Sequence, residues 1–434
     1  MRDKITSKLN KNIVLITLSL ILFTSVIIVK HMGLDIFSDD EVRYNRNIGG
    51  LFDILQYYWH FNGRMTTDVL AEILVHHFSL WVLIDCLMYI VTLYLIAKLL
   101  ELHDWYLIWM EEILILMFPF SYWTSAGFVS TTTNYLYPTT ALLLVMLAIK
   151  NIIIAKSSNI FLIIGGFLGI SYLGFSEQYV IACILFLCGA IFYIITTNRS
   201  SGVSRLSVGL LAAMALYSLV LLCSMYFSPG HLLRMSSSET TTDWFPQFAD
   251  WTLPQKIMEG FTTTVANVLF HDNKITIALC IALALLAINS SKHILVKFIG
   301  MLPLLGLLCI RILGAERFII FYPYSYTLPD IDYASLGEYA LLGLAASLVI
   351  VTAMFASILL LAEDSLQRLF LFMLLLAGAA SREIMGFSAT IYASSFRTFT
   401  LFLFLMIIAF LDIVKHLDKK YDEKALILIL LLLL

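Results

Sequence analysis

Long apolar runs broken by short polar stretches are the dominant pattern of this chain. A helix of about 20 apolar residues crosses a bilayer. Runs of this kind lie near residues 12–30, 72–97, 105–120, 135–154, 159–174, 178–196, 206–227, 274–291, 294–313, 336–361, 366–380 and 394–414. Three of the runs, the third, the fifth and the eleventh, are short, so the pattern predicts about 10 to 13 transmembrane helices. The expected fold class is an all-α polytopic membrane protein, with residues 1–434 as a single integral membrane domain.

The composition agrees with this class, because 60% of the residues are hydrophobic and only 13% are charged. The formal net charge of −3 gives no sign of nucleic-acid binding. All six cysteines lie in apolar runs, which predicts buried thiols rather than disulfides or a metal site.

The orientation follows from lysine and arginine, which are denser in one set of connecting loops than in the other. The basic N-terminal stretch leads into a long apolar run with no cleavage site, so we expect an uncleaved first span that starts in the cytoplasm. The loops expected outside are long: residues 31–71, 121–134, 228–273 and 314–335. The first and third of these are the main extracytoplasmic segments.

Two of the outer stretches, residues 48–61 and 253–270, repeat apolar side chains at steps of three and four residues. This spacing predicts amphipathic helices. They either lie on the membrane surface or pack into a cap outside it, and the pattern does not separate the two.

The stretch FSDDE, residues 37–41, leaves the first apolar run with three consecutive carboxylates. Ser38 and Glu41 have the spacing of a capping box, and Asp39 and Asp40 would then lie in a first helical turn, where the helix dipole favours anions. Capping needs only Ser38 and Glu41, so the adjacent pair Asp39 and Asp40 also fits a general base aimed at a substrate hydroxyl. Both interpretations remain open, and they are compatible.

Polar and aromatic residues gather in two further outer stretches. Trp123, Asn134 and Tyr135 lie where the chain re-enters the membrane, and they fit either an aromatic belt or a sugar-binding surface. Glu177 and Gln178 interrupt an apolar run, and they fit either a helix start or contacts with a donor sugar.

Several arginines lie near outer membrane boundaries. Most arginines in such places reach for the interface or pair with acids. Several that converge on one pocket would suit a phosphate, which a guanidinium group binds with two hydrogen bonds. The candidates are Arg64, Arg234, Arg311, Arg317, Arg382 and Arg397.

Taken together, these motifs resemble the bacterial GT-C glycosyltransferase superfamily, whose acidic pair follows the first span. The set SDD, NGR (62–64), NYLYP (134–138), SEQ (176–178), PGHLLR (229–234) and SSFR (394–397) is similar to a family of bacterial membrane proteins with DD, GR, NYLWP and PGN-x-x-R motifs. Two departures are Tyr137 in place of tryptophan and His231 in place of asparagine.

The resemblance implies transfer of a single hexosyl or N-acetylhexosaminyl group from an undecaprenyl-phosphate carrier to a surface polysaccharide. It places the active site on the outer face of the bacterial plasma membrane. Asp39 or Asp40 would be the base, and the substrate-binding residues would include His231 and the candidate arginines. Among these arginines, the groups that hold the carrier phosphate would include Arg234, Arg317 and Arg397. No metal or cofactor is expected. Membrane lipids, the lipid-linked donor and the glycan acceptor are the expected partners. A lipid-carrier flippase or transporter, a polysaccharide polymerase and a non-catalytic assembly subunit remain alternatives.

Overall fold

Each apolar run that predicts a span contains a helix in the computed structural model of the chain. The structure describes residues 2–46, 48–118, 126–154, 159–197, 205–236, 246–271, 273–314 and 338–417. Within these ranges every regular element is a helix. The predicted all-α class is therefore confirmed.

The helices fall into three groups along the chain. The first group is α1 (Arg2–His31), α2 (Asp39–Tyr44), α3 (Leu51–Phe61), α4 (Met65–His76), α5 (Phe78–Leu100) and α6 (Trp105–Leu116). The second is α7 (Phe128–Thr131), the π-helix η2 (Thr132–Leu136), α8 (Tyr137–Ile154), α9 (Ile160–Leu173), α10 (Glu177–Thr197), α11 (Arg205–Tyr226) and α12 (Pro229–Ser236). The third is η3 (Pro246–Asp250), α14 (Leu253–Val265), η4 (Ala266–Phe270), α15 (Lys274–Asn289), α16 (Ile294–Leu313), α17 (Glu338–Leu361), α18 (Ser365–Glu383), η6 (Ile384–Phe387), α19 (Ile391–Ser394), η7 (Ser395–Phe399) and α20 (Thr400–Leu417).

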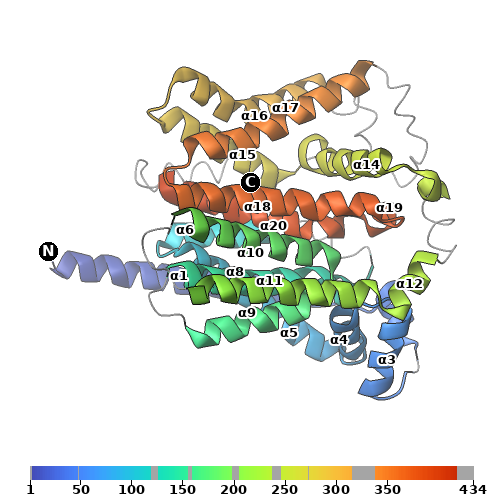
Figure 1. Cartoon of the computed structure of the whole chain (residues 1–434). Helices are drawn as coiled ribbons and strands as arrows, with labels where there is room; N and C mark the ends of the chain where they lie inside the picture. Colours follow the sequence, from blue (N-terminus) through green and yellow to red (C-terminus); the bar gives the residue numbers. More distant parts are fainter. Residues whose placement is uncertain are drawn as a thin grey trace.

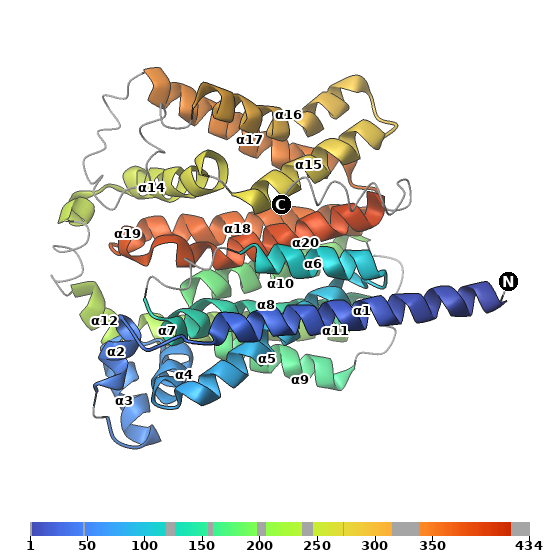
Figure 2. The same cartoon turned by 180° about the vertical axis from the view of Figure 1, so that it is seen from behind.

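Nine helices in the described ranges are long and apolar enough to cross a membrane, or ten if Leu253–Phe270 and Lys274–Asn289 form one bent span. Two runs that the sequence marks as short give the shorter helices α6 and α9. The chain is thus a multi-pass membrane protein. The membrane-crossing helices run side by side, and α3, α12 and α19 gather at one end of the bundle (Figure 1). The opposite view shows α2 at the same end (Figure 2). We call this end the α3 end.

The described chain starts and finishes away from the α3 end. The helix α1 runs toward the α3 end, and α20 runs away from it, so both described termini point to the opposite end (Figure 2). This arrangement is the one that the expected topology requires. In the same view α6 lies between α1 and α20.

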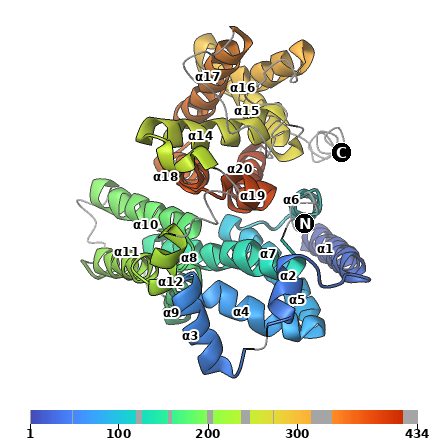
Figure 3. The ribbon, with the colours of Figure 1, turned by 90° about the vertical axis from the view of Figure 1, so that its right-hand side faces the viewer.

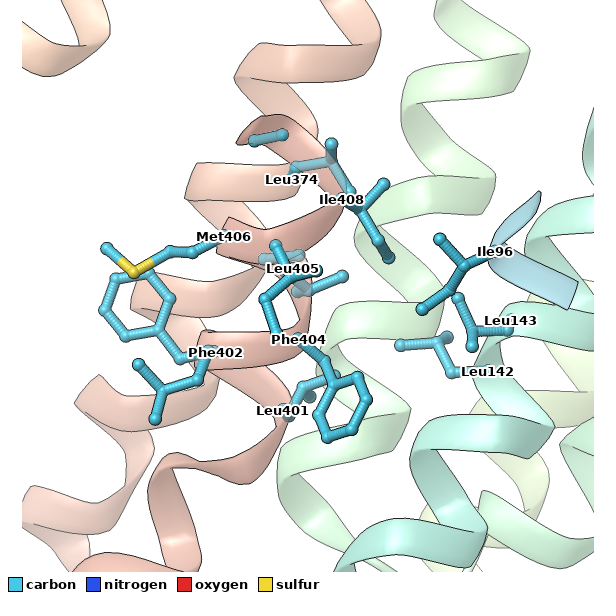
Figure 4. Close-up of a cluster of buried hydrophobic side chains, with 14 of the residues drawn as sticks. Ile96, Leu142, Leu143, Leu374, Leu401, Phe402, Phe404, Leu405, Met406 and Ile408 are labelled. Atoms are coloured by element: carbon cyan, nitrogen blue, oxygen red, sulfur yellow. The ribbon is translucent and has the colours of Figure 1, made fainter. Parts of the chain in front are cut away.

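The core is built around α20, because 94% of the best apolar window of Phe396–Leu417 is buried, against 11% for Asn12–His31. Viewed from the α3 end, α18 and α20 lie side by side between the first two helix groups and α14 to α17 (Figure 3). The side chains of α20 meet Ile96 of α5 and Leu142 and Leu143 of α8 (Figure 4). A helix that is apolar all round needs such complete covering by protein or lipid. The exposed leucines and isoleucines of α1 face outward, as a lipid-facing helix requires.

The structure contradicts one sequence-based expectation and favours one alternative of another. The expectation that all six thiols are buried is wrong, since Cys188, Cys223 and Cys309 are exposed on outward faces of apolar helices. A face that meets lipid is as apolar as a core, so the sequence pattern does not separate the two. The helix α14 packs on α18 and η6 and buries Glu259 and Gly260, which favours the packed alternative for residues 253–270.

Candidate functional site

The two acidic side chains at the start of α2 lie in different environments. Asp39 is exposed, whereas Asp40 is fully buried. The expected capping box does not form, because Ser38 has a φ of 56° and makes no side-chain bond to the start of the helix. A helical pair at i and i+1 points in directions about 100° apart, so packing covers one carboxylate and leaves its neighbour in solvent.

Asp40 caps another helix instead of its own. The backbone N–H groups of Val129 and Ser130 donate to its two carboxylate oxygens, at 2.9 and 2.8 Å. They belong to the first turn of the helical segment Phe128–Ile154, where the backbone has N–H groups without helical partners. Gly127 precedes this turn with a φ of 82°, and a Cβ there would lie 2.4 Å from the Asp40 carboxyl carbon. Only glycine therefore fits at position 127.

The burial of Asp40 also changes its acidity. Loss of water around the carboxylate raises its pKa, and the bonds from Ser130 and Val129 and the charge of Arg43 oppose that rise. A carboxylate whose two oxygens each accept a backbone bond and that has no exposed surface is poorly placed to take a proton from a substrate. Asp39 is the accessible member of the pair.

Arg43 ties α2 to its neighbours. Its Nε donates to Ser130 Oγ at 3.0 Å, and its Nη2 donates to Asp68 Oδ1 at 2.7 Å. It also donates to the Tyr58 hydroxyl, which in turn donates to Glu72 at 2.6 Å. Burial lowers the pKa of Arg43, but its interactions with Asp68, Tyr58 and Glu72 together keep that pKa above its usual value. Asp39 and Arg43 are four residues apart and share one face of α2.

Asp68 joins α2 to two of the sequence motifs. Asn62 of the NGR motif donates to one carboxylate oxygen, and Asn134 of the NYLYP motif donates to the other at 3.3 Å. Asn134 also donates to Ser130 O at 2.9 Å. Asn134 lies in the π-helix η2, whose wider turn redirects its side chains out of the regular helical pattern.

A charged cluster stands next to this network. Arg64 Nη2 lies 3.1 Å from Glu177 Oε2, and both side chains are about a quarter exposed. His231 and Arg234 lie close enough to Glu177 to interact with its charge, and Arg234 also interacts with Arg64. Tyr135 is a further neighbour of both arginines. We call Arg64, Glu177, His231 and Arg234 the arginine cluster.

Close backbone packing holds the arginine cluster together. The helix α12, which carries His231 and Arg234, packs on α3. A Cβ on Gly230 would lie 2.4 Å from the backbone nitrogen of Asn62, so this contact requires glycine. The PGHLLR and NGR motifs are far apart in sequence and meet here directly.

His231 is half-buried beside the ring of Tyr226, with 5.0 Å between the ring centroids. Burial lowers its pKa, the nearby Glu177 opposes that shift, and Arg234 and Arg64 reinforce it. The imidazole is therefore neutral at pH 7 and offers a hydrogen-bond donor and an acceptor without a charge.

Other candidate residues lie elsewhere. Gln178 donates to the carbonyls of Ser381 and Thr398 at 3.0 and 3.4 Å, so it joins α10 to α18 and η7. Arg382 is fully buried over the Phe399 ring, 3.8 Å from its centroid.

Arg311 donates to the carbonyls of Phe270 and His271, at the end of η4. Arg397 is half-buried in η7. Arg64 and Arg234 lie close enough to each other to interact. Trp123 and Arg317 lie outside the described residues.

The sequence interpretation did not name the residues that support these groups: Arg43, Tyr58, Asp68 and Glu72 lie outside the motifs, and Asn62 is the first residue of the NGR motif. A signal was present, because Asp68 and Glu72 are four residues apart on α4 and therefore project from one face of that helix. Among the described residues, no three His, Cys, Asp or Glu side chains stand close enough to hold a metal ion.

These observations define a class: a polytopic all-α membrane protein with a polar, charged site at one end of its bundle. Comparison of the chain with protein-family models, with curated proteins and with solved structures found no match.

Proposed function

We propose that the chain is a GT-C-type glycosyltransferase that moves one sugar from undecaprenyl phosphate to a cell-surface glycan, on the outer face of the bacterial plasma membrane. The observation that carries the proposal is that four separate motifs meet at the α3 end. Arg64, Asn134, Glu177 and Arg234 come from NGR, NYLYP, SEQ and PGHLLR, and the acidic pair is joined to them through Arg43 and Asp68. These motifs are far apart in sequence, so local structure does not bring them together. A shared functional site would explain why they meet.

Asp39 is the proposed base. An acceptor hydroxyl loses its proton as its oxygen attacks the anomeric carbon, and an exposed carboxylate can accept that proton. The bond from the anomeric carbon to the phosphate oxygen breaks, and attack from the opposite face inverts the anomeric centre. Asp40 holds α2 against the start of α7 and so fixes the position of Asp39.

Arg64 and Arg234 are the proposed contacts of the leaving phosphate. The carrier phosphate gains negative charge as the glycosidic bond breaks, and preorganised guanidinium groups stabilise that charge. Both arginines interact with the negative charge of Glu177, which holds them near each other at the α3 end. Such stabilisation uses no metal and no cofactor.

The replacement of asparagine by His231 is consistent with this role, since a neutral imidazole and an amide both give uncharged hydrogen bonds. The variant His231→Asn is expected to keep transfer within roughly tenfold, because one neutral hydrogen bond is worth about 0.5–1.5 kcal/mol.

The pKa of His231 is lowered in the folded protein, so the unfolded chain binds the proton first and stability falls as the pH drops below 6.5.

Thermal unfolding measured at pH 7 and at pH 5.5 checks this dependence of stability on pH. The wild type should lose more stability than His231→Asn over that interval. An equal loss in both proteins would show that His231 is not the titrating group.

The test of the proposed function is an assay on purified protein with polyprenyl-phosphate sugar and an acceptor fragment. Release of free carrier phosphate with one sugar added per acceptor is the expected result. A polymerase would instead add a preformed oligosaccharide from its carrier. Movement of the donor across a liposome bilayer with no bond cleaved would overturn the enzyme assignment.

One set of observations favours the transporter alternative. Asp85 and His31 form a buried pair at 2.9 Å, and Glu112 accepts from Ser19 at 3.1 Å. Glu111 is fully buried, and its carboxylate has no hydrogen-bond partner among the described residues. Buried ionisable groups in membrane helices are typical of proton and ion pathways. The same liposome assay distinguishes the two functions.

A further inference from the structure

We infer that Asp68 is a positioning residue of the site: it sets where Asp39 stands relative to the arginine cluster. The inference rests on the proposed function, and it assigns to Asp68 a role that none of the sequence motifs contains. Asp68 lies on α4, next to the NGR motif and outside it.

The geometry places Asp68 between the two halves of the site. One oxygen accepts from Arg43 of α2 at 2.7 Å and from Asn134 of η2 at 3.3 Å. The other accepts from Asn62, whose own amide oxygen accepts the backbone N–H of Arg64 at 2.9 Å. A short chain of bonds thus runs from the helix of Asp39 through Asp68 to the backbone of Arg64.

Asp68 acts here as a buried anion, since only 3% of the residue is exposed. Arg43 and Arg64 outweigh the effect of burial and lower its pKa, with help from Asn62 and Asn134. An ionised, fully bonded carboxylate is a poor proton acceptor and a good fixed counter-charge. This separates its role from that of Asp39.

Loss of the Asp68 charge should have two opposite consequences. Arg43 loses its shortest ion pair, so α2 is held less firmly and Asp39 is misplaced; a misplacement of about 1 Å can lower a rate on the order of 10²-fold. At the same time Arg64 and Arg234 lose a nearby negative charge, because both interact with Asp68. The site then becomes more positive and should bind an anion more tightly.

The experiment compares wild type, Asp68→Asn and the control Asp53→Asn as full-length proteins in lipid nanodiscs. Asp53 is an exposed carboxylate on the neighbouring helix α3. Three quantities are measured: Kd for undecaprenyl phosphate, kcat for sugar transfer and the thermal unfolding temperature. Asp68→Asn is expected to lower kcat on the order of 10²-fold and to tighten Kd by about threefold or more. The control Asp53→Asn should stay within about twofold of wild type in both kcat and Kd.

A purely structural role would weaken binding and turnover together, in step with a lower unfolding temperature, and that result would overturn the inference. If Asp68→Asn does not fold, Arg43→Lys breaks the same link from the other side while keeping the charge. It should lower kcat and leave Kd within about twofold, and an unchanged kcat would also overturn the inference. A wild type that binds the carrier phosphate but transfers no sugar would refute the proposed function, while the effect of Asp68→Asn on Kd still decides the charge role.

Discussion

Asp39→Asn is expected to lower sugar transfer by about 10²–10⁴-fold, the usual contribution of a general base, and to leave the thermal unfolding temperature unchanged. The amide keeps the shape of the side chain but cannot take the proton of the acceptor hydroxyl. Asp39 is exposed, so its replacement disturbs no packing. Turnover in the purified system and a thermal unfolding curve are the two measurements.

Asp40→Asn provides the matched comparison one residue further along. An amide can accept only one of the two backbone bonds from Val129 and Ser130 and turns its NH₂ group toward the other N–H. A buried donor left without a partner costs about 1–3 kcal/mol. This variant should therefore unfold at a lower temperature and lose activity for that reason. If Asp40→Asn is inactive but as stable as wild type while Asp39→Asn is fully active, the two roles are exchanged.

Arg234→Lys and Arg64→Lys are expected to lower kcat by on the order of 10²-fold, while Kd for the carrier phosphate weakens by less than about tenfold. Lysine keeps the charge but loses the planar pair of donors that matches a phosphate. The larger effect on turnover follows because the phosphate gains charge in the transition state. Steady-state kinetics together with direct binding to undecaprenyl phosphate separate the two quantities.

Arg311→Lys is the control for both variants, since Arg311 donates to the backbone carbonyls of Phe270 and His271 at the end of η4. It should leave the kinetic constants unchanged and affect stability alone. Equal losses in all three lysine variants would point to a general effect of arginine on folding. Unchanged turnover in Arg64→Lys and Arg234→Lys would contradict the assignment of these two arginines as contacts of the phosphate.

The membrane helices could be predicted from the sequence because a bilayer imposes one simple rule on length and apolarity. The short runs at α6 and α9 show its limit. They form helices of 12 and 14 residues, shorter than the roughly 20 residues that cross a bilayer. The exposed Cys188 shows a second limit, since lipid and protein interior favour the same residue types.

The site could be predicted in part. Arg64, Glu177 and Arg234 were candidates because polar residues at membrane boundaries are costly without a purpose. The different environments of Asp39 and Asp40 could not be predicted, because they depend on the start of α7, which lies nearly ninety positions further along the chain.

Gln178 and Arg382 could not be assigned from sequence for a related reason. Each lies where two distant segments pack, and a bond between such segments leaves no local pattern. Asp68 stood outside every motif and became visible only through the four partners that surround its side chain or charge: Arg43, Asn62, Asn134 and Arg64.

The central place of α20 has a consequence for how the protein is made. Synthesis proceeds from the N-terminus, so α1 to α18 enter the membrane before the helix that fills the space among them. Until Phe396–Leu417 arrives, the surfaces of α5, α8 and α18 that it covers must face lipid or one another. The bundle is therefore completed late, and a chain released before α20 would leave those surfaces of α5, α8 and α18 without their protein neighbour.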